Sequence, residues 1–476
     1  MPAKAIVPGD ASSFIHRFRG HGPLLQDRSI DWSQIHLARH DACASPRSPP
    51  VSTIRRFLPT RPPPLSLIRP FTALRPAPGR AADVIAPPYD VLSSAEARDR
   101  VAGRPWSFLH ISKPEIDLPT DIDVHAPEVY AKGAANLRHM VDAGVLVRDR
   151  APCYYVYRMT MGTHVQTGIV AGASVADYDT NRIRKHEHTR PDKEDDRVRQ
   201  IEAVGGHTGP VLLAYPATPE VDALLAEAAS STPDADAVAD DGIRHTLWVV
   251  RDIAVQARIG SAFDAMTALY IADGHHRSAA ASRVAEARRR AGDGPDGESQ
   301  RFLAVAFPHH EMRILPYNRV VRDLGRFSST DFLAALEHDF DVRPEPAAVA
   351  PAQPREFGLH LAGGRWFRLR LRAGRVPVDD PVARLDVSLL ATYALEPLLD
   401  IRDPRRDPRI DFVGGIRGLP ELEKRVGSGE MAAAFSMHPT RLTDLMAVAD
   451  AGLVMPPKST WFEPKLADGM TNLMLD

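Results

Sequence analysis

Residues 268–285 read ALYIADGHHRSAAASRVA, and this stretch predicts the unit around which the rest of the fold is built. The apolar run 268–272 has the length of a buried strand. Asp273-Gly274 interrupts it with residues that favour turns. The small helix formers of 278–285 then indicate a helix. The stretch therefore predicts a strand, a tight turn and a helix.

The polar residues of this turn form the first candidate site. Free backbone N–H groups and the helix dipole favour an anion at a helix N-terminus, here Gly274. Arg277 adds a planar fork of donors suited to phosphate or carboxylate. Asp273, His275 and His276 complete the group. The alternative is that Asp273 is only an N-cap and the two histidines are only first-turn surface residues.

A second polar cluster lies at 182–197, where RIRKHEHTR is followed by an acidic and basic helix start. Lys185, His186 and Arg197 can hold a phosphate or a metal, and Glu187 can act as a general base. The alternative is a solvated charged loop that leads into a helix. We expect this cluster and the Asp273 cluster to meet in space.

Composition limits the class of protein. The chain has 476 residues, a net charge of -2 and 25% charged residues, so no strong field points to nucleic acid or an acidic membrane as a partner. Its two cysteines, Cys43 and Cys153, make no disulfide framework and no zinc pattern, which suits a reducing compartment. No apolar stretch is long enough to span a membrane. We therefore expect a cytoplasmic protein.

The order of the segments predicts an α+β fold with a mixed-sheet core. Residues 1–64 are rich in proline and poor in apolar periodicity, so we expect a disordered extension, or a segment upstream of the true gene start. The expected ligand-binding core is 65–325. A small α+β subdomain at 326–380 precedes a C-terminal α/β segment, 381–476, that packs back on the core.

Several individual elements can be predicted by pattern. Residues 106–111 suggest a strand, and 153–175 suggest a β-hairpin. A buried strand at 301–307 has 312–321 as its expected hairpin partner. Two further strands within 356–371 are joined by Ala362-Gly363-Gly364, a hairpin signal.

Several longer motifs resemble the DUF1015 family of uncharacterised bacterial and archaeal proteins, from about residue 67 to the end. The matching motifs are IRPFTALRP at 68–76, IAPPYDVLS at 85–93, RKHEHT at 184–189 with Arg197, IADGHHRSAA at 271–280, LPYNRVV at 315–321 and MPPKSTWFEPKL at 455–466. Four residues in these motifs are further candidates for phosphate or substrate binding: Tyr89, Asp90, Asn318 and Lys458.

Residues 274–280, GHHRSAA, also fit GxxRxxA, a motif of the ParB/sulfiredoxin-like superfamily. Members include a CTP-binding DNA-segregation protein, an ATP-using sulfinic acid reductase and kinases that phosphorylate free serine. The resemblance implies a nucleotide-phosphate site at Gly274–Arg277. The chain lacks the second phosphate motif of the segregation proteins and their basic helices, and the turn has no cysteine. We therefore expect neither DNA partition nor sulfiredoxin chemistry.

The leading functional hypothesis is an enzyme that transfers a phosphoryl group from ATP or ADP, with Mg²⁺, to a small hydroxylated metabolite such as an amino acid. Glu187 or Asp273 would accept the hydroxyl proton. His275 and His276 would contact phosphate or transfer protons. We expect no nucleic-acid and no membrane partner.

Two alternatives remain open at this point. One is a metal-dependent hydrolase with His186, His188, His275 and His276 as ligands, together with Asp273 or Glu187. The other is a non-catalytic regulator that binds a nucleotide and a partner protein. The sequence names neither the acceptor nor the metal nor the oligomeric state.

Overall fold

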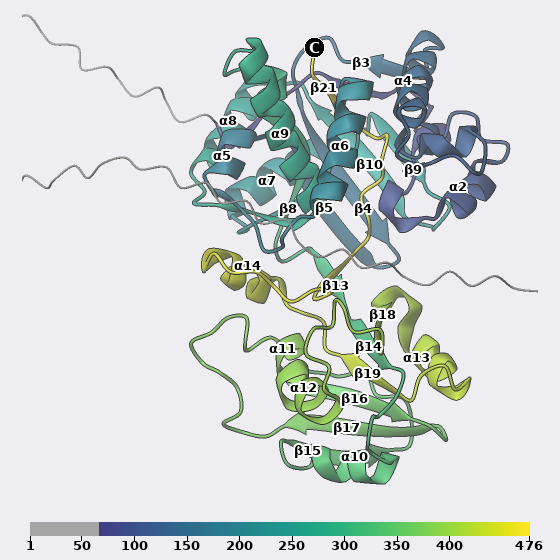
Figure 1. Cartoon of the computed structure of the whole chain (residues 1–476). Helices are drawn as coiled ribbons and strands as arrows, with labels where there is room; N and C mark the ends of the chain where they lie inside the picture. The colour runs from purple at the N-terminus through teal and green to yellow at the C-terminus, as the bar shows by residue number, and fades with distance from the viewer. Residues whose placement is uncertain (1–65) are drawn as a thin grey trace, which may run out of the picture. The chain divides into compact units, whose positions relative to one another are not determined.

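The main sheet of the protein combines parallel and antiparallel neighbours, which gives the α+β fold with a mixed-sheet core that the sequence predicts (Figure 1). The computed structural model describes residues 66–476, so the prediction for 1–64 falls outside the described residues. Along the sheet the strands are, in order, β6 (Ile183–Arg184), β11 (Leu269–Asp273), β8 (Val211–Tyr215), β12 (Arg301–Pro308), β5 (His164–Ser174), β4 (Tyr154–Met161), β10 (Arg244–Val250) and β9 (Ala235–Val238), with β1 (Ile68–Arg69) paired to β5.

Both faces of this sheet are covered. Tyr154 and Val156 of β4 belong to one hydrophobic cluster, whereas Tyr155 and Tyr157 belong to another. This alternation follows from the period of two along a strand. A strand covered on both faces is apolar throughout, and β8 is buried at all of its positions. The sheet is therefore a rigid internal support for the loops at its edges.

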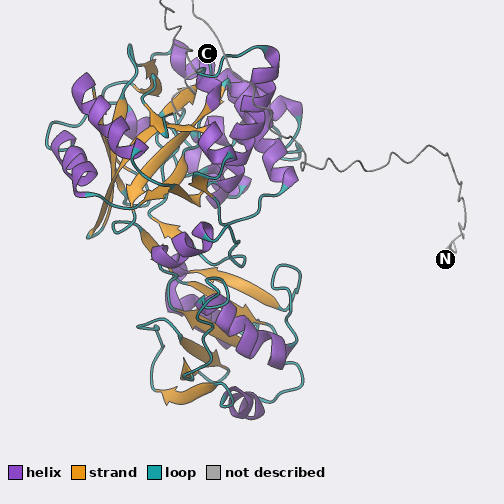
Figure 2. Ribbon diagram, turned by 90° about the vertical axis from the view of Figure 1, so that its left-hand side faces the viewer, coloured by secondary structure: helices purple, strands orange, loops and turns teal. Residues whose placement is uncertain are grey.

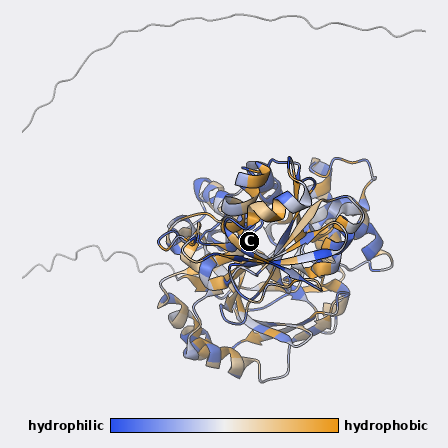
Figure 3. Cartoon of the chain, turned by 90° about the horizontal axis from the view of Figure 1, so that it is seen from below, coloured by the Kyte–Doolittle hydropathy of each residue, from blue (hydrophilic) through white to orange (hydrophobic). Residues whose placement is uncertain are grey.

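Helices lie on both sides of the main sheet strands (Figure 2). Around the strands they carry hydrophilic and hydrophobic residues together, as amphipathic helices do (Figure 3). The helices up to β12 are α1 (Ala81–Val84), α2 (Ser94–Val101), α3 (Leu109–Ser112), α4 (Pro127–Asp142), α5 (Val175–Asp179), α6 (Pro191–Val204), α7 (Pro219–Ala228), α8 (Ile253–Asp264) and α9 (His275–Ala291).

A second sheet has six strands, in the order β15 (Phe340–Glu345), β17 (Arg365–Leu371), β16 (Glu356–Leu361), β19 (Ala433–Met437), β14 (Tyr317–Val321) and β18 (Ile410–Gly414). The helices of this part are α10 (Ser329–Leu336), α11 (Asp386–Leu390), α12 (Glu396–Leu399), α13 (Gly418–Gly427) and α14 (Leu442–Asp450). The predicted hairpin of β16 and β17 is confirmed. This one sheet takes strands from all three predicted segments. The predicted boundaries at 326 and 381 therefore fall between strands of the same sheet.

The C-terminal tail returns to the first half of the chain. β21 (Asn472–Met474) lies between β2 (Ala73–Pro76) and β7 (Gly206–His207), and β3 (Leu146–Arg148) completes this four-stranded sheet. β20 (Trp461–Glu463) pairs with β13 (Arg313–Leu315). The tail also places Lys465 beside Asp273, at the end of β11 where α9 begins.

Two element predictions are wrong. Residues 106–111 form no strand, because Leu109–Ser112 is a helix that buries Leu109 and Ile111 beneath α4. The strand at 301–307 does not pair with 312–321, because β12 lies between β5 and β8 instead. In both segments the apolar residues are buried, but the type of element or the pairing partner differs from the prediction. Within 66–476, no helix has the length and apolarity that crossing a bilayer requires.

Candidate functional site

The site is centred on the turn between β11 and α9. The sheet pairing of β11 shifts register between Ile271 and Asp273, and Gly274 follows with a φ of 101°. Only glycine adopts this backbone conformation readily. The 17-residue helix α9 then begins with no side chain capping its N-terminus. Its first backbone N–H groups therefore remain available to a ligand.

Two cavities adjoin this turn. The first, of about 770 Å³, is lined by the turn, by the Pro87–Leu92 loop and by the tail from Met455 to Ala467. The second, of about 960 Å³, is lined by α6, by the loop before α4 and by residues near Arg405. Eight residues line both cavities: Tyr89, Asp90, Leu92, Glu187, His276, Met455, Pro457 and Lys458. These eight residues are called the shared wall below.

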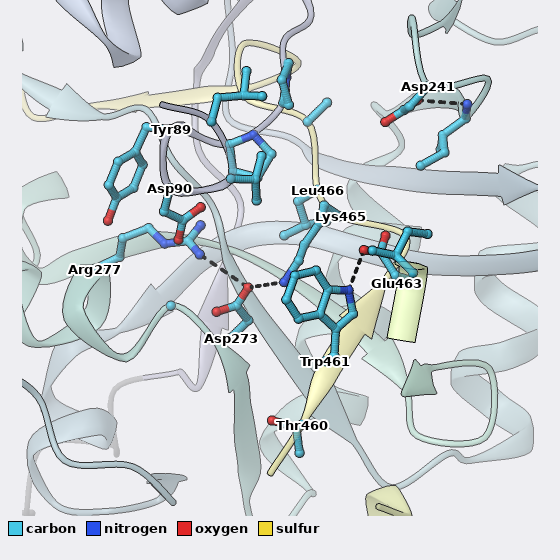
Figure 4. A pocket seen from close by; sticks show the side chains of 18 of the residues that line it. Tyr89, Asp90, Asp241, Asp273, Arg277, Thr460, Trp461, Glu463, Lys465 and Leu466 are labelled. Atoms are coloured by element: carbon cyan, nitrogen blue, oxygen red, sulfur yellow. Dashed lines mark hydrogen bonds and ion pairs between the residues drawn. The ribbon is translucent and has the colours of Figure 1, made fainter. Parts of the chain in front are cut away.

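Asp273 lies between two cations in the first cavity (Figure 4). Its Oδ2 atom is 3.2 Å from Nζ of Lys465 and 3.8 Å from a guanidinium nitrogen of Arg277. Burial alone would raise the pKa of Asp273, but the charges of Lys465 and Arg277 outweigh it and lower that pKa. Asp273 is therefore a carboxylate at neutral pH and is already paired.

The guanidinium of Arg277 is enclosed by acceptors. It donates to the backbone carbonyl of Pro210, and Asp90 and Asp468 act on its charge in addition to Asp273. The carboxyl of Asp468 is buried, and one of its oxygens has no hydrogen-bond partner among the described residues. Burial raises the pKa of Asp468 to about 7, although Arg277 opposes this.

The two clusters predicted from the sequence meet in space. The rings of His186 and His275 are 4.4 Å apart edge to face, and Nδ1 of His275 is 3.8 Å from Oε2 of Glu187. One possible ligand atom from each of these three residues lies within 4.8 Å of the others. The prediction that the two clusters meet in space is confirmed.

Burial controls the protonation of this trio. Burial lowers the pKa of His186 to about 4. Burial is also the main cause that lowers the pKa of His275 well below its usual value, and repulsion between the two rings when both are protonated is the second. Both rings are therefore neutral near pH 7. The side chain of Glu187 is 59% exposed, and that surface faces the two cavities. Partial desolvation is the main cause that raises the pKa of Glu187, and the negative charge of Asp273 is the second.

His276 is held by the second cluster. Its Nε2 atom accepts a hydrogen bond of 3.1 Å from the backbone N–H of Arg190. A neutral ring that accepts at Nε2 carries its proton on Nδ1. Burial lowers the pKa of His276, which keeps the ring neutral. His188 lines the second cavity but does not belong to the trio of His186, Glu187 and His275.

Tyr89 and Arg197 stack against each other in the wall of the second cavity. The guanidinium carbon of Arg197 lies 3.8 Å from the centre of the Tyr89 ring. Nε of Arg197 also donates to Asp196 over 2.9 Å. Burial raises the pKa of Tyr89, although Arg197 opposes this. This stack and ion pair fix the loop that carries Asp90.

Two of the predicted binding residues do not reach either cavity. Nζ of Lys185 donates to the carbonyl of Tyr178 over 2.9 Å, away from both linings. Asn318 is 2% exposed, and its side-chain oxygen accepts from the backbone N–H of Met437, which joins β14 to β19. Lys458, by contrast, lines both cavities.

Lys465 and Asp468 lie at the turn although no local sequence pattern marks them as site residues. Lys465 pairs with Asp273 across 192 positions, and its only signal was membership of the motif 455–466. Asp468 forms an isolated β-bridge with Ala86, just before the loop of Tyr89. Asp468 lies in none of the family motifs, and a lone aspartate forms no local sequence pattern that predicts a site.

Three solved structures are similar to this chain at low identity. A conserved hypothetical protein from Pyrococcus furiosus is 14% identical with a TM-score of 0.31, covering 64% of this chain and 94% of that one. A free serine kinase in complex with AMP is 13% identical with a TM-score of 0.32, covering 65% and 91%. C-terminally truncated SbnI from Staphylococcus aureus is 10% identical with a TM-score of 0.34, covering 64% and 87%.

The curated proteins include no detectable relative of the chain. The sequence does match the family described as "Protein of unknown function (DUF1015)" over residues 68–388. That range contains the Tyr89 loop, the His186 cluster and the Asp273 turn, whereas Lys465 lies beyond it. The chain belongs to the DUF1015 family.

Proposed function

We propose that this protein is a nucleotide-dependent phosphotransferase that acts on a small hydroxylated metabolite. The observation that carries the proposal is the arrangement around the first cavity. An uncapped helix N-terminus and two cations, Arg277 and Lys465, lie on one side, and the carboxylate of Glu187 lies on the shared wall. Phosphoryl transfer depends on positioning and charge neutralisation together with a base for the acceptor hydroxyl.

The turn between β11 and α9 offers groups that can bind the phosphates of a nucleotide. The backbone N–H groups after Gly274 and the dipole of α9 favour negative charge at that end. Lys465 and Arg277 are held in place by Asp273, so little ordering is needed when a phosphate arrives. The cavity of about 770 Å³ is within the size range of sites for ligands of this class.

Glu187 is the proposed general base. Its raised pKa makes it a stronger base than a glutamate with the usual pKa. The ring of His275, 3.8 Å away, is neutral and adds no positive charge beside the carboxylate. Because Glu187 lines both cavities, a hydroxyl in the second cavity can face a phosphate in the first.

A carboxylate of the first cavity, Asp90, could bind a nucleotide-bound Mg²⁺. Asp90 lines the cavity and has no ion-pair partner among residues 66–476, whereas Asp273 is already paired. One free carboxylate fits an ion held mainly by phosphate oxygens and water. Such an ion would supply neutralisation of phosphate charge.

The decisive test is nucleotide binding followed by transfer. Purified chain is screened by thermal shift with ATP, ADP, CTP and GTP, with and without Mg²⁺. A ligand at about 100 times its Kd stabilises by roughly 2.7 kcal/mol, which is easily measured. Glu187→Gln should keep this shift and reduce transfer to hydroxylated acceptors by about 100-fold or more. Absence of any nucleotide shift would contradict the proposal.

A metal-dependent hydrolase is the second candidate, because of the trio His186, Glu187 and His275. Two neutral imidazoles and one carboxylate next to an open cavity suit a borderline metal such as zinc better than Mg²⁺. One buried nitrogen of His186 also has no partner among the described residues. Stoichiometric zinc, manganese or iron in purified protein, lost in Glu187→Gln, would favour this function over phosphotransfer.

A further inference from the structure

The second cavity contains more positive charge than its own residues neutralise. Its buried carboxylate Asp196 is paired with Arg197 and accepts from the Tyr130 hydroxyl over 2.8 Å. Glu115 lies 3.1 Å from the ammonium of Lys113. These two carboxylates are therefore paired within the wall. The other two carboxylates of the lining, Asp90 and Glu187, are fewer than the three lining cations that form no ion pair, Lys193, Arg405 and Lys458.

Three cations of this cavity form no ion pair. Lys193, Arg405 and Lys458 have no carboxylate within ion-pair distance in the part of the chain that the structure describes. Arg405 and Lys458 both act on the charge of Glu187. Lys458 belongs to the shared wall and can serve a phosphate in either cavity. Lys193 and Arg405 line only the second cavity.

We infer that the second cavity is the acceptor site and that the acceptor carries a carboxylate or phosphate group in addition to its hydroxyl. The inference rests on the proposed function and names its substrate class. The anionic group binds between Lys193 and Arg405, which line the second cavity and not the first. The hydroxyl then faces Glu187 on the shared wall. An uncharged acceptor would leave this excess of positive charge unused.

The step is balanced without any further reactant. The acceptor oxygen forms a bond to the terminal phosphorus of the nucleotide, and the bond from that phosphorus to the bridging oxygen breaks. The hydroxyl proton passes to Glu187, and the electron pair of the broken bond stays on the departing nucleotide. The cations Lys193 and Arg405 hold the acceptor and take no part in bond making.

The test compares three probes that share one carbon skeleton, namely D-glycerate, glycerol 3-phosphate and uncharged glycerol. Their affinities for the full chain are measured by calorimetry at constant ionic strength, with and without ADP. The matched variants are the double substitution K193Q with R405Q and the control K424Q with R406Q, which removes two exposed cations outside both cavities. Both double variants change the net charge equally, so a general charge effect cancels.

We expect at least one charged probe to bind about 10-fold more tightly than glycerol, with that advantage lost in K193Q with R405Q and kept in the control. The better of the two charged probes distinguishes carboxylate from phosphate. Charged probes that bind no better than glycerol, or equally well to both double variants, would overturn the inference. ADP binding with no anion preference contradicts the inference alone. Anion binding without any nucleotide response contradicts the proposed function and supports the anion site.

Discussion

Nζ of Lys465 lies 3.2 Å from Oδ2 of Asp273, so the C-terminal tail supplies the counter-charge for the carboxylate of the β11–α9 turn. The side chain of Asp273 is 35% exposed, and it faces the first cavity. The pair is therefore partly hydrated, although the surrounding chain encloses it. This contact makes the tail part of the site and leads to the first prediction.

Lys465→Met should destabilise the fold by about 1–2 kcal/mol, because Asp273 then loses one of its two cations. The figure is below that for a fully buried pair because cavity water reaches the carboxylate. The pKa of Asp273 should rise in the variant, since Lys465 lowers it in the native protein. Urea unfolding measures the first effect. Adding Asp273→Asn should recover part of the loss, and an equal loss in the double variant would contradict the pairing.

Gly274→Ala tests the turn, with Gly292→Ala as its matched control. Gly274 and Gly292 have φ values of 101° and 109°, so both variants should lose about 1–2 kcal/mol of stability from backbone strain. A Cβ at Gly274 would lie 3.1 Å from Nε of Arg277, whereas one at Gly292 meets nothing within 4 Å. Nucleotide affinity, measured by thermal shift, should therefore fall only in Gly274→Ala. Equal affinity loss at both positions would show that Arg277 is not involved.

Turnover should depend on the ionisation of Glu187. The base must be deprotonated, so kcat falls as the pH drops through its pKa. Because that pKa is raised, the acidic limb should lie above the value of about 4.3 for an unperturbed glutamate. A kcat profile across acidic pH checks this. The residual activity of Glu187→Gln should lack the limb, and a limb that persists in this variant would assign it to another group.

Mild acid should destabilise the protein through its buried histidine His207. Burial lowers the pKa of His207 to about 4, below its unfolded value near 6.5. The unfolded chain therefore binds the proton first, and stability is lost as the pH falls from about 6.5 to about 4. For this one histidine the loss approaches about 3 kcal/mol. Unfolding free energies at pH 7 and pH 5 measure it.

His207 lies on β7, outside both cavities, so it can be changed without touching the site. His207→Asn should lower stability at pH 7 and give a shallower decline toward pH 5. His338→Asn, at an exposed histidine, provides the control and should leave the slope unchanged. An unaltered slope in His207→Asn would contradict the assignment to this residue.

Local sequence determined the elements that need only their neighbours. The strand, Gly274 turn and helix of 268–285 follow from apolar run, breaker and helix formers within one short window, and they formed as predicted. Ser93 and Glu96 likewise form a complete capping box at the start of α2, from residues three positions apart. These interactions join residues a few positions apart, so a short pattern contains all of their partners.

Only the tertiary structure decided which distant groups share a cavity. The meeting of Glu187 with His275 was predicted as a hypothesis from residue types, but Lys465 and Asp468 reach the turn through tail pairing that no periodicity encodes. Asn318 illustrates the opposite case, since a polar residue in a distinctive motif is used to join two strands. The physical reason is the same for each: strand order and charge pairing are set by long-range burial, and the energy of a buried charge depends on partners that the local sequence does not contain.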